Sequence, residues 1–108
     1  TYAWPETFEF PQVLERVSLE LRRKKEQFRI SALSKVDNPA ATIEGFNRQF
    51  QIDKKGKEAI EWAWQREAGD TMFNVVNAYT RAAQFEGLSA ESRYRLQKVG
   101  GMILEMVQ

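Results

Sequence analysis

The sequence predicts an all-α fold, a bundle of four to five helices with an extended aromatic N-terminal arm. Apolar residues recur at spacings of three and four along most of the chain, and turn-forming residues separate these segments. No strand-like alternation of useful length competes with them. The 108 residues, 43% hydrophobic and 29% charged, are enough for one globular domain and too few for two.

The first eleven residues are the predicted arm, and residues 12–108 are predicted to form a single helical domain. The arm contains two prolines and four aromatic residues, so we expect it to be extended, with its rings resting on a neighbouring surface. Apolar residues from Val13 to Phe28 then follow helical spacing and predict one long helix over residues 11–35. This helix should end near Asn38, because a residue before proline is biased away from the helical region.

Two helices are predicted in the middle of the chain. The segment over residues 39–50 has weaker periodicity, and Gly45 lowers its helix propensity by about 1 kcal/mol relative to Ala. The second helix covers residues 54–68; Asp53 can cap its start, and Gly69 is a suitable stop.

Two more helices complete the predicted bundle. One covers residues 71–86, is capped by Asp70 or Thr71 and closes at Gly87. The last covers residues 90–107 and opens at Ser89. Gly100 and Gly101 lie inside it, and each costs about 1 kcal/mol in a helix interior. We therefore expect another helix to approach closely there.

Charge and composition exclude several classes of function. Sixteen Lys and Arg residues against fifteen Asp and Glu residues leave a net charge of +1, so no overall field attracts nucleic acid or an anionic membrane. Cysteine and histidine are absent, which excludes disulfides, thiolate or imidazole metal sites and Ser-His or Cys-His catalysis. The carboxylates show no paired spacing typical of a general acid and base. We therefore expect a protein without enzymatic activity or cofactor.

The apolar runs are shorter than the roughly 20 residues that a membrane-spanning helix needs, so no membrane partner is predicted. The lack of cysteine fits a reducing compartment, and we expect a cytoplasmic location. Because the chain begins at Thr1 and ends while an apolar pattern is still running, we expect it to be a fragment of a longer protein.

A basic cluster on the long helix is the main electrostatic feature of the sequence. A phosphate backbone would complement it, which makes single-stranded DNA a candidate partner. A solvated helix face explains the same cluster, because long cationic side chains often cover apolar surface with their stems. The residues of this cluster are Arg22, Arg23, Lys24, Lys25 and Arg29.

Other residues are candidates for contacts with a protein partner. Leu19, Ile30 and Leu33 lie on the side of the long helix opposite its main apolar stripe, which indicates a second packing partner. Trp62 and Trp64 point in roughly opposite directions on a helix, so one of them should be exposed or lie at an interface. A polar stripe that includes Asn74, Asn77 and Arg81 could bond to something specific, because asparagine is a poor helix former, or could simply face solvent.

The stretch Thr71–Thr80 contains Phe73 and the run Asn77-Ala78-Tyr79-Thr80, and a helix carrying Leu96-Gln-Lys-Val-Gly-Gly101 follows it. This pattern resembles the C-terminal helical part of the phage/plasmid-like protein family known as domain of unknown function 932. The resemblance extends from about Thr42 to the end of the chain. It implies an origin in a bacterium, phage or mobile element, a larger N-terminal part, no established activity, and a link to single-stranded DNA handling or recombination.

Together these observations predict a helical interaction module that packs on its parent protein or associates with a second copy. The alternative is a module that binds single-stranded DNA through the basic cluster.

Overall fold

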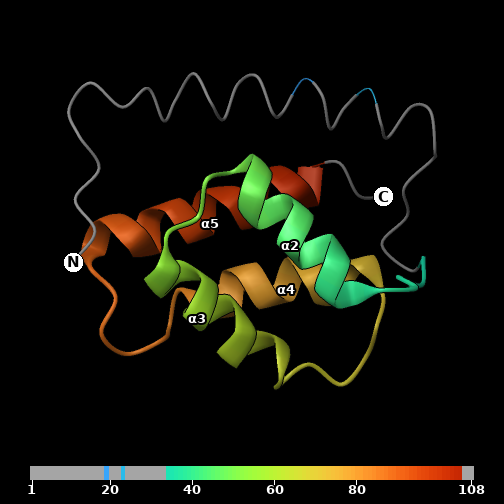
Figure 1. The fold of residues 1–108 in the computed structure, drawn as a ribbon, viewed down its shortest axis with the longest axis horizontal. Coiled ribbons are helices and arrows are strands. Elements are labelled where there is room, and N and C mark those ends of the chain that lie inside the picture. Colours follow the sequence, from blue (N-terminus) through green and yellow to red (C-terminus); the bar gives the residue numbers. More distant parts are fainter. Residues whose placement is uncertain (1–18, 20–22, 24–33, 106–108) are drawn as a thin grey trace.

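The structure is a computed structural model that describes Leu19, Arg23 and residues 34–105 (Figure 1). These residues contain four named helices: α2 (Pro39–Gln49), α3 (Lys54–Trp64), α4 (Met72–Ala82) and α5 (Ala90–Glu105). Within the described residues, extended pairing is limited to an isolated bridge between Lys35 and Thr71. The predicted all-α bundle is therefore confirmed for the part of the chain that the structure describes.

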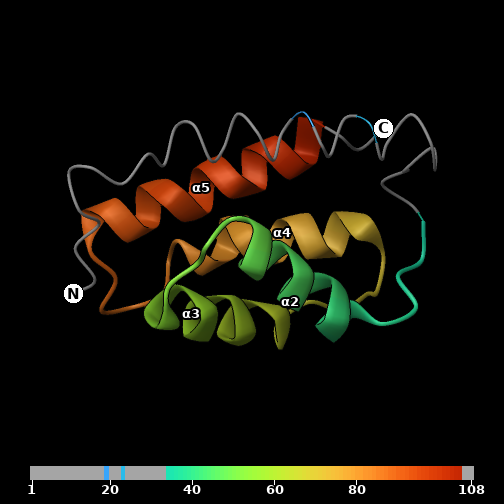
Figure 2. The ribbon, with the colours of Figure 1, turned by 45° about the horizontal axis from the view of Figure 1, so that its top comes forward.

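Helix α4 lies at the centre of the described residues. It packs against α3 on one side and α5 on the other, and α2 crosses over it (Figures 1 and 2). Its sequence fits this position, because its buried residues form one broad face of the helix. The largest fully buried side chains of the core come from α4, from α3, from α5 and from the end of α2: Tyr79, Phe50, Ile60, Leu96, Ile103, Val75, Val76 and Val99.

The cap residues that the sequence indicates are in place. Asp53 accepts a hydrogen bond from the Gly56 backbone N–H (2.7 Å), which caps α3. Thr71, not Asp70, caps α4. Ser89 accepts a hydrogen bond from the Ser92 backbone N–H (3.1 Å) at the start of α5.

The predicted ends of α3 and α4 are wrong by four residues each. Helix α3 stops at Trp64 rather than residue 68, and α4 stops at Ala82 rather than residue 86. After both helices, backbone N–H groups bond to carbonyls three residues back, as Glu67 does to Trp64 (3.0 Å) and Phe85 does to Ala82 (3.0 Å). These tighter turns give the last helical carbonyls a hydrogen-bond donor. Each α-helix therefore ends before the chain reaches Gly69 or Gly87.

The C-terminal boundary of the predicted first helix is also wrong. Ser34 and Lys35 are extended, because their backbone pairs with the segment that enters α4: Met72 donates to the Ser34 carbonyl (2.9 Å), and Val36 donates to the Asp70 carbonyl (2.8 Å). The arm over residues 1–11 and most of the predicted helix lie outside the described residues. Before Ser34 the structure describes Leu19 and Arg23, and both are helical.

The connection between α2 and α3 is a Schellman motif built without glycine. Gln51 has a left-handed backbone (φ 54°), and Ile52 donates to the Asn47 carbonyl (2.9 Å) while Gln51 donates to the Arg48 carbonyl (3.3 Å). This sharp reversal buries Phe50 and Ile52 on either side of Gln51.

A buried tyrosine joins α4 to α2. The Tyr79 hydroxyl is inaccessible to solvent and donates to Asn47 Oδ1 (2.7 Å), with the Ile43 carbonyl oxygen also near (3.2 Å). The Phe46 ring meets the Tyr79 ring edge to face, with centroids 6.3 Å apart. Burial raises the pKa of the Tyr79 hydroxyl well above its ordinary value of about 10, so the group stays a protonated donor.

The two adjacent glycines of α5 have different surroundings. A Cβ at Gly100 would lie 2.7 Å from Thr80 Cγ2 and 3.4 Å from the Thr80 backbone nitrogen, whereas a Cβ at Gly101 would meet nothing within 4 Å. The expected close approach of a second helix is thus confirmed at Gly100 and wrong at Gly101.

We predict that Gly100→Ala lowers the free energy of unfolding by about 1 to 3 kcal/mol, because the added methyl group overpacks the contact with Thr80. Gly101→Ala should raise it by up to about 1 kcal/mol through helix propensity alone. Urea denaturation of the two variants measures both effects. Adding Thr80→Ser removes Cγ2 and should restore most of the loss; equal effects of the two glycine substitutions would contradict the close approach.

We predict that the stability contributed by Tyr79 declines as pH rises above about 10, where the unfolded hydroxyl ionises and the buried one does not. Below that pH the contribution is fully present. Tyr79→Phe should lower stability by about 1 to 2 kcal/mol at neutral pH and remove this part of the alkaline slope. Denaturant titrations of both proteins between pH 8 and 11 give the comparison, and identical slopes would contradict the assignment.

Candidate functional site

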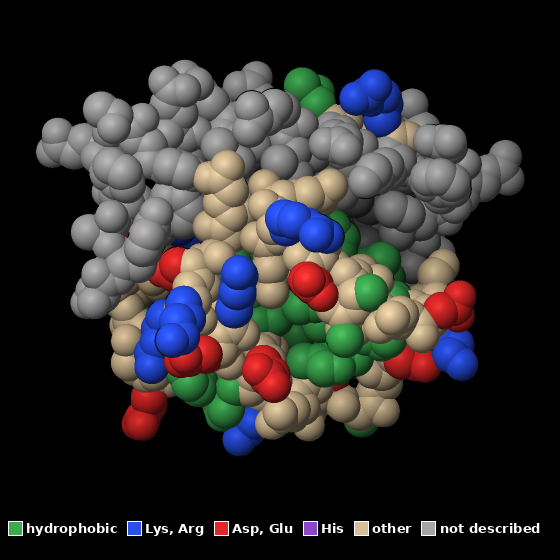
Figure 3. Space-filling model, in the orientation of Figure 1, with side chains coloured by type: hydrophobic (Ala, Val, Ile, Leu, Met, Phe, Trp, Pro, Cys, Tyr) green, Lys and Arg blue, Asp and Glu red, His purple; other side chains and the backbone are tan. Residues whose placement is uncertain are grey.

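A groove between α2 and α3, hereafter the α2–α3 groove, has a volume of about 600 Å³. The reversal at Gln51 joins the two helices, and side chains at helical spacing on each of them face the space between. Figure 3 looks onto this region and shows an apolar floor with basic and acidic side chains around it. The lining residues are Ala40, Ile43, Glu44, Asn47 and Arg48 of α2, Lys57, Glu61 and Trp64 of α3, and Gln65.

Charged side chains of both signs line the groove. Arg48 and Lys57 lie nearer the helix reversal, and Glu44 and Glu61 lie one turn further from it on their helices. None of the four forms an ion pair with another residue in the described part of the chain. Their charges are available to groups outside the domain.

Asn47 links the groove to the core. Its Oδ1 accepts a hydrogen bond from the Tyr79 hydroxyl, which orients the amide. Asn47 lines the groove but is only 8% exposed. The amide nitrogen makes no hydrogen bond within the described residues. The buried Tyr79 therefore holds the Asn47 amide in place at the groove, and the amide nitrogen is a hydrogen-bond donor without an acceptor.

The polar stripe predicted on α4 is partly used within the chain. Asn74 closes a capping box with Thr71, because Asn74 Oδ1 accepts from the Thr71 backbone N–H (3.1 Å) and hydroxyl (2.7 Å). Its amide nitrogen donates to Glu67 Oε2 (3.0 Å), whose side chain is 5% exposed. A Cβ at Gly69 would lie 2.5 Å from Asn74 Oδ1, so Gly69 leaves room for this side chain instead of ending α3.

Arg81 completes the same cluster. Its Nη1 lies 3.6 Å from Glu67 Oε1 and donates to the Arg66 carbonyl (2.9 Å). The specific partners expected for Asn74 and Arg81 are thus residues of the segment between α3 and α4. Asn77 lies one turn from both and lines a shallow polar recess of about 280 Å³ with Thr80, Arg81 and Gln84.

The two tryptophans have different neighbours, and both are half-buried. Trp62 packs against Phe85 (centroids 5.4 Å apart), and the Arg66 guanidinium lies over its ring at 4.3 Å. Trp64 lines the α2–α3 groove. The candidate contact residue Trp62 is therefore engaged within the domain, and Trp64 is the tryptophan at a possible binding surface.

Most of the predicted N-terminal candidates lie outside the described residues. Arg22, Lys24, Lys25 and Arg29 of the basic cluster and the apolar residues Ile30 and Leu33 are in this group. Arg23 is helical and exposed. Leu19 is helical and 57% exposed, so an apolar side chain faces outward there.

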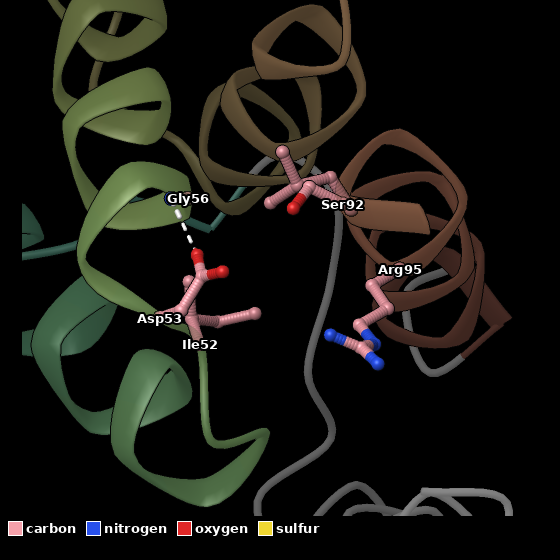
Figure 4. Close-up of a pocket in the computed structure, with 6 residues that line it drawn as sticks. Ile52, Asp53, Gly56, Ser92 and Arg95 are labelled. Atoms are coloured by element: carbon pink, nitrogen blue, oxygen red, sulfur yellow. Dashed lines mark hydrogen bonds between the residues drawn. The ribbon is translucent and has the colours of Figure 1, made fainter. Parts of the chain in front are cut away.

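A small cavity between the start of α3 and α5 is too small for a ligand. Figure 4 shows Ile52, Asp53 and Gly56 on one side and Ser92 and Arg95 on the other. Its volume of about 10 Å³ accommodates no more than about one water molecule. Arg95, 5% exposed, pairs with Glu91 one turn away. The printed polar contacts of this region stay within each element: Asp53 caps α3, and Arg95 pairs with Glu91 along α5.

Among the described residues, no group of three acidic side chains could hold a metal ion. None of the described helices is long and apolar enough to cross a membrane. Comparison of the chain with protein-family models, with curated proteins and with solved structures finds no match.

Apart from Trp64, which was one of two tryptophans expected at an interface, the sequence did not single out the residues of the α2–α3 groove. A signal was present, since Ala40, Glu44 and Arg48 recur every four residues, as Lys57, Glu61 and Gln65 do. That spacing places each set on one helix face but does not show that the two faces meet.

We predict that Asn74→Ala lowers the free energy of unfolding by about 2 kcal/mol or more, because it removes the capping box and leaves the buried Glu67 carboxylate without its amide donor. Asn77→Ala, three residues away on the same stripe, should change it by only a few tenths of a kcal/mol. Urea denaturation distinguishes them. Equal losses would contradict the structural role of Asn74.

Proposed function

We propose that the chain is a non-enzymatic helical interaction module, which packs on the rest of a longer parent protein or on a second copy of itself through the α2–α3 groove. The observation that carries the proposal is the groove itself. It combines an apolar floor at Ile43 and Trp64 with four charged side chains that have no ion pair in the described structure.

The chemistry of the groove favours a polypeptide partner. Apolar contacts with the floor would supply binding free energy, and charges of both signs would set the orientation of the partner. A nucleic acid would meet Glu44 and Glu61 at the same surface, where like charge repels phosphate. A protein segment can present an apolar side chain, a carboxylate and an ammonium group together.

The resemblance to the phage/plasmid-like family known as domain of unknown function 932 supports the same proposal, because it implies a larger N-terminal part for this module to contact. A cytoplasmic location belongs to the proposal as well.

We predict that Ala40→Arg, at the exposed margin of the groove, weakens binding to the rest of the parent protein or self-association by about tenfold or more, since the long side chain fills the space a partner would occupy. Ala41→Arg is the matched control: it is exposed on the same helix but does not line the groove. Sedimentation velocity of the chain, alone and mixed with the rest of its parent, measures the effect.

An absence of both self-association and complex formation would overturn the proposed function, as would equal effects of the two arginine substitutions. Fluorescence anisotropy with single-stranded DNA adds a second readout. Tight, salt-dependent DNA binding that Ala40→Arg leaves unchanged and Arg22→Ala with Arg23→Ala abolishes would assign the function to the basic cluster instead.

A further inference from the structure

We propose that the α2–α3 groove binds residues 1–11 of a second copy of this chain, held as an extended segment. The inference rests on the proposed function and deepens it, because it names the occupant of the groove. It is argued from what the groove lacks, from the sequence of the segment, and from the outward-facing apolar residue near the segment.

The end of the groove nearer the helix reversal, where Arg48 and Lys57 lie, is called the inner end here. It lacks a negative charge and a hydrogen-bond acceptor. Arg48 and Lys57 come from different helices and have no carboxylate partner in the described structure. Asn47 lines the same groove, and its amide nitrogen has no acceptor in the described structure, while its oxygen accepts from Tyr79. A carboxylate between the two cations and a backbone carbonyl at Asn47 would satisfy all three groups.

The rest of the groove offers apolar surface beside the carboxylates of Glu44 and Glu61. Ile43 of α2 and Trp64 of α3 supply this apolar surface, and the indole offers a flat face for another ring. Gln65 and Asn47 line opposite sides and can bond to the free N–H and C=O groups that an extended backbone carries. The fitting occupant is an extended segment with aromatic side chains and one carboxylate on the same face.

Residues 1–11 have this chemistry. Tyr2, Trp4, Glu6, Phe8 and Phe10 occupy alternate positions, so an extended backbone places four aromatic rings and one carboxylate on one face. The segment contains two glutamates and no Lys or Arg, which complements the basic inner end of the groove. Its two prolines favour an extended backbone and reduce the entropy lost on binding.

The outward position of Leu19 favours a second copy as the source. Leu19 is helical and 57% exposed, so the N-terminal part of the chain presents an apolar side chain away from its own domain. Association of two copies could bury this side chain while each copy places its first residues on the other. Reciprocal exchange of one segment gives a closed two-fold dimer at low energetic cost.

The test compares sedimentation velocity of the full 108-residue chain and its variants over a range of concentrations. The wild type should form a dimer, and Arg48→Glu with Lys57→Glu should weaken it by about tenfold or more. Lys54→Glu with Lys98→Glu is the matched control, because it changes the net charge equally at exposed positions outside the groove. Circular dichroism confirms that each variant is folded.

Charge exchange provides the sharpest arm of the experiment. Glu6→Lys should weaken the wild-type dimer and restore the dimer of the Arg48→Glu, Lys57→Glu variant, whereas Glu9→Lys, on the other face of an extended segment, should do neither. A synthetic peptide with the sequence of residues 1–11 should dissociate the wild-type dimer, and a scrambled peptide should not.

A wild-type chain that stays monomeric would overturn the inference, including the case in which its own first residues fill its groove. A dimer insensitive to Glu6→Lys and to the groove charges would also overturn it. If Ala40→Arg still disrupted that dimer or a complex with the parent protein, the proposed function would stand and only the named occupant would be wrong.

Discussion

The packing of the described helices depends on α4, which contacts α2, α3 and α5 at the same time. Its small residues Ala78 and Ala82 are fully buried. The larger side chain of Tyr79 is also fully buried, and it contacts Asn47 of α2. The hydroxyl of Tyr79 would be costly in an apolar core without an acceptor. Asn47 supplies that acceptor, so one hydrogen bond fixes the position of α2 over α4 and also orients the polar side chain that the groove exposes.

A second polar cluster sets the path of the chain into α4. Asn74 accepts from Thr71 and donates to Glu67, and Arg81 approaches the same carboxylate from two turns further along α4. Because Glu67 is buried, its charge has to be compensated by these groups. Polar residues in the middle of a helix, which resemble a binding surface when only the sequence is considered, serve here to anchor a loop.

The groove follows from the geometry of the connection between α2 and α3. The left-handed backbone at Gln51 turns the chain so that both Phe50 and Ile52 are buried. Burial in the core consumes one face of each helix. The remaining faces, with Ile43 and Trp64 between charged residues, border a hollow instead of packing against each other.

The sequence by itself determined the class of fold, the existence of the described helices and the caps at Asp53, Thr71 and Ser89, because these features depend on residues within three or four positions of one another. Only the tertiary structure decided where α3 and α4 end, why Gly100 but not Gly101 needs to be small, and which residues line the groove. Helical spacing shows which side chains share a face. Which faces meet is fixed by contacts such as that of Tyr79 with Asn47, between residues 32 positions apart, and these form only when the whole core is buried.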